Sequence, residues 1–434
     1  MKAPTASGAR PGSLSAGCLG AALLGCLLLG SAAAASGAPA SAGGHAHGLG
    51  PGHHATHTRG HAHSSPHAPL YVSPHGKKGA PCTKQAPCPT IAAALKAARP
   101  GARIIVTGGS YHEMVKITKR LTLIGRGRPT IDAKGLENAI ELSGPGAAGS
   151  RVEGLTAENA EMEGILALST SNVTIARNVV RENDQGSKAA KPIGECAPQG
   201  PIPGDCGEGL HLMGTSHARV IANIVSGNSG GILLTDEPGP TAHNLIEKNR
   251  VEGNLYDCGI TMAGHSTKAV SAGGATQPTL GGIYDNRVID NTVNGNGVKG
   301  EGAGILLAVP APGGGVYDNL IQGNTANGNG MGGITIHSHA PGQDLNGNRL
   351  INNRLSGDGI AGNHGGPGDV DAGISQTVGI TIFSAVVPIR QILVKANTIS
   401  NVHFGIWVKN APPISAAANH FKGVAVPVEV ASAP

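Results

Sequence analysis

The chain has 434 residues and a formal net charge of +5; glycine supplies 69 residues, whereas aromatic residues make up 2 % and charged residues 14 %. This composition excludes an acid-rich disordered chain, and so much glycine argues against a compact globular domain. Lys and Arg are scattered without interleaved aromatic residues, so we do not expect nucleic acid as a partner. The composition instead favours a narrow aliphatic core bounded by many tight turns.

Residues 1–42 have the features of a secretory signal peptide. Lys2 and Arg10 precede an apolar stretch over residues 14–30, and small residues that suit a cleavage site follow it. Cys26 leaves lipid anchoring open as an alternative. We therefore expect a secreted or cell-envelope protein, with no transmembrane span in the mature chain.

Residues 43–69 form a low-complexity segment rich in Gly, Pro and His, which we expect to be a disordered linker. Neutral imidazoles in such a segment bind Zn²⁺, Ni²⁺ or Cu²⁺ weakly. Because no fixed ligand spacing is visible, a solvated spacer is the favoured interpretation.

Residues 70–434 are expected to form a single domain that begins with a short helix. Residues 90–99 are rich in Ala, with Thr90 as a plausible N-cap and Pro100-Gly101 as a stop signal. This helix should cover one open end of a repeat array, because terminal repeats must shield their neighbours. Short strands are expected at 103–106, 114–117, 121–124 and 130–131.

Eight times between Gly164 and Phe421 the sequence repeats a glycine with an apolar strand, then an Asn with a second apolar strand. A unit without insertions, such as residues 209–231, takes about two dozen residues and holds three short runs of period two. One unit cannot bury its apolar face alone, so the units must stack as an all-β parallel β-helix. Asn residues at one turn of successive coils should hydrogen-bond to each other, and these are Asn178, Asn223, Asn249, Asn291, Asn324, Asn353, Asn397 and Asn419.

The cysteines indicate two local disulfides. Cys82 and Cys88 bracket one short loop, and Cys196 and Cys206 bracket another. Cys258 is then the odd cysteine, and its place beside a strand favours a buried thiol.

The order of Tyr71-Val72-Ser73-Pro74, an Ala-rich helix, Pro100-Gly101 and the later Gly-Ile and Asn repeats resembles exported pectate-lyase-like β-helix proteins over nearly all of the mature chain. That superfamily includes polysaccharide lyases, polygalacturonases, alginate lyases, mannuronan epimerases and the maturation proteins of nitrous-oxide reductase. The resemblance implies a right-handed solenoid with a short N-terminal capping helix. The chain lacks the catalytic patterns of polygalacturonases and of the first pectate lyase family, so no active-site residue is carried over from them.

Long insertions flank the glycine strands on both sides, so we expect a groove on the outward face of their sheet. Counted from each strand glycine, Glu237, His265 and His339 share one column, and the first two lie on adjacent coils, about 5 Å apart. Imidazole beside carboxylate is suited to general acid–base catalysis. The candidate catalytic residues are His211, Asp236, Glu237, Asp257, His265, His337 and His339.

The same region offers ligands for a cation. Asp205, Glu208, Asp236 and Glu237 could bind a hard ion such as Ca²⁺. His265, His337 and His339 would suit a transition-metal ion instead.

The sequence thus favours an exported carbohydrate-active protein of the polysaccharide lyase, hydrolase or epimerase type, with a polysaccharide or cell-surface polymer as its partner. The alternative is a non-catalytic β-helix that binds a surface polymer, a partner protein or a metal ion, similar to the reductase maturation proteins. The sequence leaves open whether the protein is an enzyme, which cofactor it uses and how it oligomerises.

Overall fold

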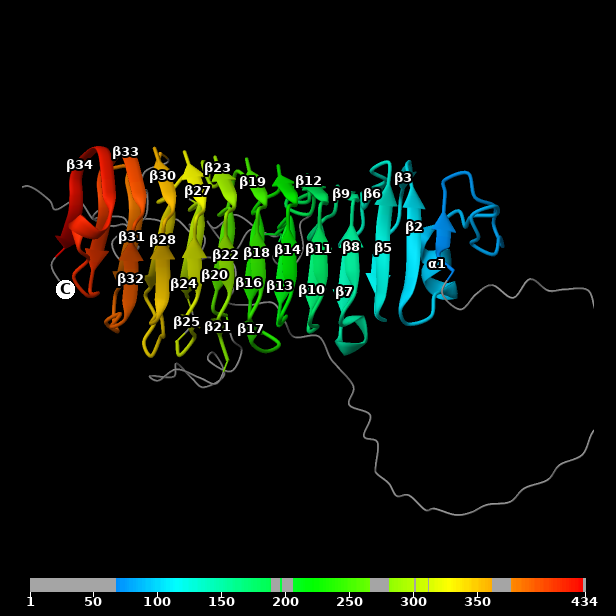
Figure 1. Cartoon of the computed structure of the whole chain (residues 1–434), viewed down its shortest axis with the longest axis horizontal. Coiled ribbons are helices and arrows are strands. Elements are labelled where there is room, and N and C mark those ends of the chain that lie inside the picture. The colour runs from blue at the N-terminus through cyan, green and yellow to red at the C-terminus, as the bar shows by residue number, and fades with distance from the viewer. Residues whose placement is uncertain are drawn as a thin grey trace, which may run out of the picture.

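The computed structural model describes residues 68–188, 196, 206–265, 281–299, 302–310, 312–360 and 376–431. They form a right-handed parallel β-helix whose strands pair in parallel from coil to coil (Figure 1), which confirms the predicted fold class. The predicted signal peptide and nearly all of the predicted linker lie outside the described residues. Among the described residues, no helix has the length and apolarity to cross a bilayer.

One face of the solenoid is an eleven-stranded sheet, called here the first sheet. From β5 onward, each of its strands comes after a strand of the second face in the same coil. Its members are β1 (Leu70–Val72), β2 (Ala102–Thr107), β5 (Leu121–Arg126), β8 (Arg151–Glu153), β11 (Thr174–Ala176), β14 (Arg219–Ile221), β18 (Leu245–Glu247), β22 (Arg287–Ile289), β26 (Leu320–Gln322), β29 (Asn348–Ile351) and β32 (Ile392–Lys395).

The predicted glycine strands form the second face, called here the glycine-strand sheet. Its members are β4 (Val115–Ile117), β7 (Ile140–Ser143), β10 (Ile165–Leu168), β13 (Leu210–Met213), β16 (Ile232–Thr235), β20 (Ile260–Ala263), β24 (Ile305–Val309), β28 (Ile334–Ser338) and β31 (Val378–Ser384). A small three-stranded sheet beside it contains β17 (Thr241–Ala242), β21 (Ile283–Tyr284) and β25 (Val316–Tyr317).

The Asn-led strands form the third face. Its members are β3 (Ser110–Tyr111), β6 (Thr130–Asp132), β9 (Thr156–Glu158), β12 (Val179–Arg181), β15 (Ile224–Ser226), β19 (Arg250–Glu252), β23 (Thr292–Asn294), β27 (Thr325–Asn327) and β30 (Arg354–Ser356). At the C-terminal end β33 (Thr398–Lys409) and β34 (His420–Ala431) run continuously through the second and third faces, which joins the two into one sheet. Two short 3₁₀ turns lie at Pro145–Ala147 and Ala416–Ala418.

The core is a set of aliphatic ladders that run along the solenoid axis. Ile260, Ile305, Ile334 and Ile380 are register partners on successive coils and all are fully buried. The sequence predicted this inward ladder from the position after each strand glycine. The next residue along each strand points outward because strand side chains alternate, and this alternation places the candidate site on the outer face.

The predicted Asn residues form a continuous buried ladder at the turn before the third face. Each amide Nδ2 donates to the Oδ1 of the Asn one coil further on, for example Asn249 to Asn291 at 3.0 Å and Asn291 to Asn324 at 3.0 Å. Two more ladders occupy other turns, one from Asn183 to Asp358 and one from Asn244 to Asn348. The structural interpretation of these residues is therefore confirmed.

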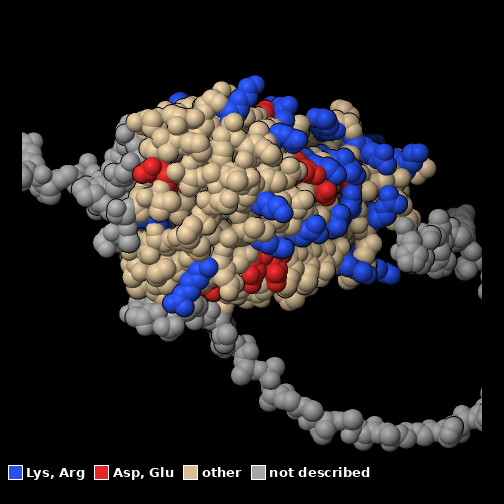
Figure 2. Space-filling view, turned by 60° about the vertical axis from the view of Figure 1, so that its left-hand side comes forward, with Lys and Arg blue, Asp and Glu red and all other residues tan. Residues whose placement is uncertain are grey.

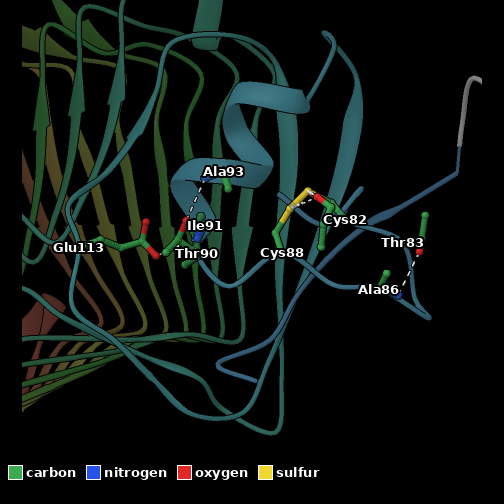
Figure 3. Close-up of a disulfide and its surroundings, with 9 residues drawn as sticks. Cys82, Thr83, Ala86, Cys88, Thr90, Ile91, Ala93 and Glu113 are labelled. Atoms are coloured by element: carbon green, nitrogen blue, oxygen red, sulfur yellow. Dashed lines mark hydrogen bonds between the residues drawn. A yellow bond between two sulfur atoms is a disulfide. The ribbon is translucent and has the colours of Figure 1, made fainter. Parts of the chain in front are cut away.

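The predicted helix is α1 (Ile91–Ala97), shorter than the sequence suggested, and it lies at the N-terminal end of the solenoid (Figure 1). Thr90 caps it as expected, since its Oγ1 accepts from the backbone N–H of Ala93 at 3.2 Å. A second cap comes from Glu113, whose two carboxylate oxygens accept from the N–H groups of Ile91 and Ala92 at 2.8 Å each (Figure 3). A carboxylate at a helix N-terminus is favoured by the dipole.

Both expected disulfides are present. Cys82–Cys88 lies beside α1 (Figure 3), and Cys196–Cys206 closes a ten-residue separation. Cys258 is buried and belongs to neither disulfide.

Candidate functional site

Polar side chains from four successive coils meet on the outer face of the glycine-strand sheet and are called here the acid–base cluster. They stand before β10, on β13, at the end of β16 and after β20. The members are Glu163, His211, Thr235, Asp236, Glu237 and His265.

His211 lies at the centre of the acid–base cluster. It occupies the outward second position of β13, between Leu166 and Leu233 on the adjacent strands. Its Nδ1 is 3.1 Å from Glu163 Oε1, and its Nε2 is 2.9 Å from Thr235 Oγ1. The imidazole is thus fixed at both nitrogens.

His265 contacts two consecutive carboxyl groups one coil away. Its Nδ1 lies 3.1 Å from Glu237 Oε1, and its backbone N–H donates to Asp236 Oδ1 at 2.7 Å. The sequence predicted that Glu237 and His265 lie close together, because both follow their strand glycine by six residues. The structure places the two side chains in direct contact. The third member of that column, His339, lies further along the solenoid beside Phe383.

The two consecutive carboxyl groups have opposite pKa shifts. Burial raises the pKa of Asp236, and the charge of Glu237 adds to the rise, to about 6. Burial alone would also raise the pKa of Glu237, but the hydrogen bond and charge of His265, the charge of His211 and a hydrogen bond from Thr235 lower it to about 2. Near neutral pH the first group thus exchanges a proton readily while the second stays ionised.

Solvent reaches the acid–base cluster through Glu237 and His265, whose side chains are 28 % and 14 % exposed. The buried oxygen Asp236 Oδ2 has no hydrogen-bond partner among the residues that the structure describes. A buried polar atom in this condition is costly unless a proton, water or ligand satisfies it.

Five of the candidate residues, which the sequence placed beside a groove, are buried. Fewer than a tenth of each side chain is exposed. The outward side chains of a parallel sheet are flanked at about 4.8 Å by those of the coils above and below, which removes much of their contact with solvent. The five residues are Glu208, His211, Asp236, Asp257 and His337.

Glu208 and Asp257 lie together before β13 and β20. Both carboxylates face Gly230, where an added Cβ would meet Glu208 Oε1 at 3.3 Å and Asp257 Oδ2 at 3.5 Å. Asp257 Oδ1 also accepts from the N–H of Cys258 at 2.6 Å. The fourth predicted cation ligand, Asp205, lies outside the described residues. The described residues contain no group of three or more His, Cys, Asp or Glu side chains placed to hold a metal ion.

His337 and His339 form a separate pair on and after β28. Their ring centroids are 5.9 Å apart with perpendicular planes. His337 is buried, and burial, aided by His339, lowers its pKa to about 3, so the ring is neutral. Neither ring nitrogen of His337 has a hydrogen-bond partner among the described residues.

Sequence reasoning missed Glu163 and Thr235. Glu163 immediately precedes a strand glycine, as Glu208 does, so the rule that selected Glu208 would have found it. Thr235 follows its strand glycine by four residues, an outward position that is occupied by many residue types.

Comparison with known protein families places the chain in one of them. Residues 132–268 and 199–357 match the family described as "NosD: Periplasmic copper-binding protein (NosD)", so the two overlapping matches cover just over half of the chain. They include every residue of the acid–base cluster. No curated protein matches the sequence.

Solved structures share the fold at low sequence identity. The catalytic domain of GH87 alpha-1,3-glucanase has a TM-score of 0.51 and 14 % identity over 85 % of this chain and 60 % of that chain. The mannuronan C-5 epimerase AlgE4 A-module of Azotobacter vinelandii has a TM-score of 0.44 and 13 % identity over 80 % of this chain and 94 % of that chain. The alginate lyase of Paenibacillus sp. has a TM-score of 0.45 and 15 % identity over 78 % of this chain and 95 % of that chain.

Proposed function

We propose that this chain, which belongs to the NosD family of β-helix proteins, is an exported polysaccharide-active enzyme that works by general acid–base catalysis at the acid–base cluster. The observation that carries the proposal is the pair Asp236 and Glu237, whose pKa values are displaced in opposite directions to about 6 and about 2. Two carboxyl groups with separated pKa values can serve as acid and base at one pH. The fold is shared with the glucanase, the epimerase and the lyase, whose names describe action on polysaccharides.

Glycoside hydrolysis uses such a pair directly. Asp236 is buried in this structure, so the substrate would have to displace the residues that cover it. Asp236 would then donate its proton to the glycosidic oxygen as the bond to the anomeric carbon breaks. Glu237 would accept a proton from the water whose oxygen forms the new bond to that carbon. His265 holds the Glu237 carboxylate in place through Nδ1, and His211 supports the ionised form of Glu237 by its charge.

The position of the acid–base cluster suits an extended substrate. Its solvent-facing members stand at the ends of β16 and β20, in the middle of a sheet that continues for several coils in both directions (Figure 1). A polymer lying along this face would pass Glu237 and His265 and present one glycosidic bond to them.

The test is a screen of the full chain on uronic and neutral polysaccharides, with reducing ends and the absorbance of unsaturated products as separate readouts. Hydrolysis predicts new reducing ends without that absorbance. On the substrate found, Asp236→Asn and Glu237→Gln should each lower kcat by about 100-fold or more, because each removes one proton-transfer partner. His217→Ala is the matched control, since His217 is exposed and contacts His243 instead of the acid–base cluster.

The proposal fails if both carboxamide variants retain wild-type turnover while remaining folded. If the products are unsaturated, the reaction is β-elimination instead of hydrolysis, and the acid–base cluster remains the proposed site. No turnover on any polymer, together with tight copper binding, would favour the second candidate below.

The second candidate function is binding of a copper ion, which the description of the matched family names. The pair His337 and His339 fits in part. His337 is a neutral imidazole whose two ring nitrogens have no hydrogen-bond partner among the described residues, and a neutral imidazole is a good copper ligand. Two imidazoles are an incomplete donor set for most copper geometries, so this pair would bind together with ligand atoms from outside it.

Equilibrium dialysis of the full chain with Cu(I) and Cu(II) would test this candidate. His337→Gln should remove the tightest binding step, while His217→Ala should leave it intact. An unchanged isotherm for His337→Gln would reject this pair as the copper site, and any binding that remained would belong to other residues.

A further inference from the structure

The first sheet carries a column of arginines that the proposed function does not use. The first outward-pointing residue of each strand from β2 to β32 is the register partner of the same residue on the next strand. In order from the N-terminal end they are Arg103, Thr122, Arg151, Thr174, Arg219, Leu245, Arg287, Leu320, Arg349 and Leu393. Arginine therefore recurs on every second coil, and we call Arg103, Arg151, Arg219, Arg287 and Arg349 the arginine column.

The C-terminal part of the arginine column is exposed and free of carboxylates. Arg219, Arg287 and Arg349 are all exposed, and within the described residues no ion pair joins any of them to an Asp or Glu. Glu247 pairs with Lys248 at 3.1 Å, and Glu153 pairs with Arg151 and Arg177. Two exposed carboxylates stand at the turn before the sheet: Asp285, 3.7 Å from His243 Nδ1, and Asp318. These three guanidinium groups are available to an external anion.

The spacing is regular and wide. Two coils of about 4.8 Å place successive arginines about 10 Å apart along a straight line. Leu245 and Leu320 stand between them. Two residues further on, the arginine strands present the partly exposed Ile221, Ile289 and Ile351, and the strands between them present Glu247 and Gln322. The face thus alternates cations with aliphatic patches.

A purely structural explanation accounts for only part of this pattern. Arginines on adjacent coils would repel one another, so alternation lowers that cost. A solvated face normally mixes both signs of charge, however, and here the exposed positions of the column between Arg219 and Leu393 carry cations and leucines only. In the view of Figure 2, Lys and Arg gather in patches over the solenoid, and Asp and Glu are fewer.

We propose that the first sheet binds an acidic polysaccharide, a chain of sugar acids that lies along the arginine column. Arg binds carboxylates in a bidentate manner. In an extended polymer, alternate sugar residues turn their carboxylates to the same side. These carboxylates would face the arginines, which recur on every second coil. The apolar faces of the sugar rings between them would lie over the leucines. The column would hold the polymer on one face of the solenoid while another face carries the acid–base cluster.

Other polyanions fit this face less well. A duplex nucleic acid presents a phosphate about every 3.4 Å along each strand, about three times denser than the arginines. Single strands are usually held by stacked aromatic side chains, and the column from Arg103 to Leu393 contains none.

Binding of the full chain to polygalacturonate or alginate, measured by surface plasmon resonance at several salt concentrations, tests the proposal. The triple variant Arg219→Gln, Arg287→Gln and Arg349→Gln should weaken binding about tenfold or more and flatten its salt dependence. The matched control is Lys77→Gln, Lys78→Gln and Lys84→Gln, which removes the same charge from exposed positions near the N-terminal cap and should bind almost as the wild type does. Thermal unfolding of both triples checks that each is folded.

Equal losses in the two triples would overturn the proposal, because net charge alone would then explain binding. Wild-type binding that is as strong to a neutral glucan would also overturn it. Arginine-dependent binding to vesicles of phosphatidylserine and phosphatidylcholine, without polyuronate binding, would assign the column to a membrane instead. Arginine-dependent binding of a polyuronate that the chain does not turn over would leave the column standing while the proposed reaction fails.

Discussion

The side chain of His265 lies 3.1 Å from the carboxylate of Glu237, the residue six positions after the strand glycine on the preceding coil. His265 also follows its own strand glycine by six residues. The contact is therefore a consequence of the coil register, because equal offsets on paired strands bring side chains one strand spacing apart. It is also why the pKa of Glu237 is low although the group is largely buried.

Removing His265 should change how stability depends on pH. The folded pKa of Glu237, about 2, lies below its ordinary value of 4.5, so the group stabilises the fold above pH 4.5 and loses this effect as the pH falls through 2. His265→Asn should therefore cost about 1–2 kcal/mol of unfolding free energy at pH 7. The difference from the wild type should shrink toward pH 2. Urea unfolding at a series of pH values measures this, and a pH-independent difference would show that His265 acts by packing alone.

The sequence was sufficient to predict the solenoid and much of its register. A repeated glycine and a repeated Asn mark fixed places in every coil, so the inward Ile ladder and the buried Asn ladder follow from counting. The pairing of Glu237 with His265 followed from the same counting. These features depend on local periodicity, which a single sequence displays.

The burial and the hydrogen-bond partners of the site residues could not be predicted, because they depend on how side chains pack across coils. The burial of His211 results from its position between Leu166 and Leu233 and from its contacts with Glu163 and Thr235. These partners are separated from it by 48 and 24 residues along the chain. The arginine column could not be predicted from the sequence for a similar reason. Insertions of different length separate the arginines along the chain, so their two-coil period is visible only once the strands are paired.

Ile305→Asp should prevent folding. Ile305 is fully buried between Ile260 and Ile334, and an unpaired carboxylate there would lose its hydration without a partner. Secretion level and thermal unfolding are the measurements, with Thr325→Asp, at a partly exposed position of β27, as the control. Normal secretion with an unchanged melting temperature for Ile305→Asp would contradict the inward register of β24.

Loss of one rung of the Asn ladder should be costly. Asn291 accepts from the N–H and the amide of Asn249, and its own amide donates to Ile246 O and to Asn324 Oδ1. Asn291→Ala would leave these buried groups without partners, so we expect a loss of about 2–4 kcal/mol. Asn327→Ala removes one partly buried side-chain hydrogen bond, to Asn294, and should cost under about 1 kcal/mol. Equal losses in chemical denaturation would show that the ladder adds no special stability.

Asp358 ends the second Asn ladder and should make the protein less stable as the pH rises. Its Oδ1 accepts from the amide of Asn329 at 2.8 Å, while burial raises its pKa from 3.8 to about 7. An acid whose folded pKa exceeds its unfolded pKa binds a proton more tightly in the folded state, so stability falls between pH 3.8 and 7 and is level above that range.

Asp358→Asn keeps the accepting oxygen and removes the charge. This variant should gain about 1–3 kcal/mol at pH 8 and little at pH 4. Urea denaturation at the two pH values measures the gain, and Asp318→Asn, at an exposed turn, is the control. A variant that is no more stable than the wild type at pH 8 would show that the Asp358 carboxylate is ionised and well solvated in the folded protein.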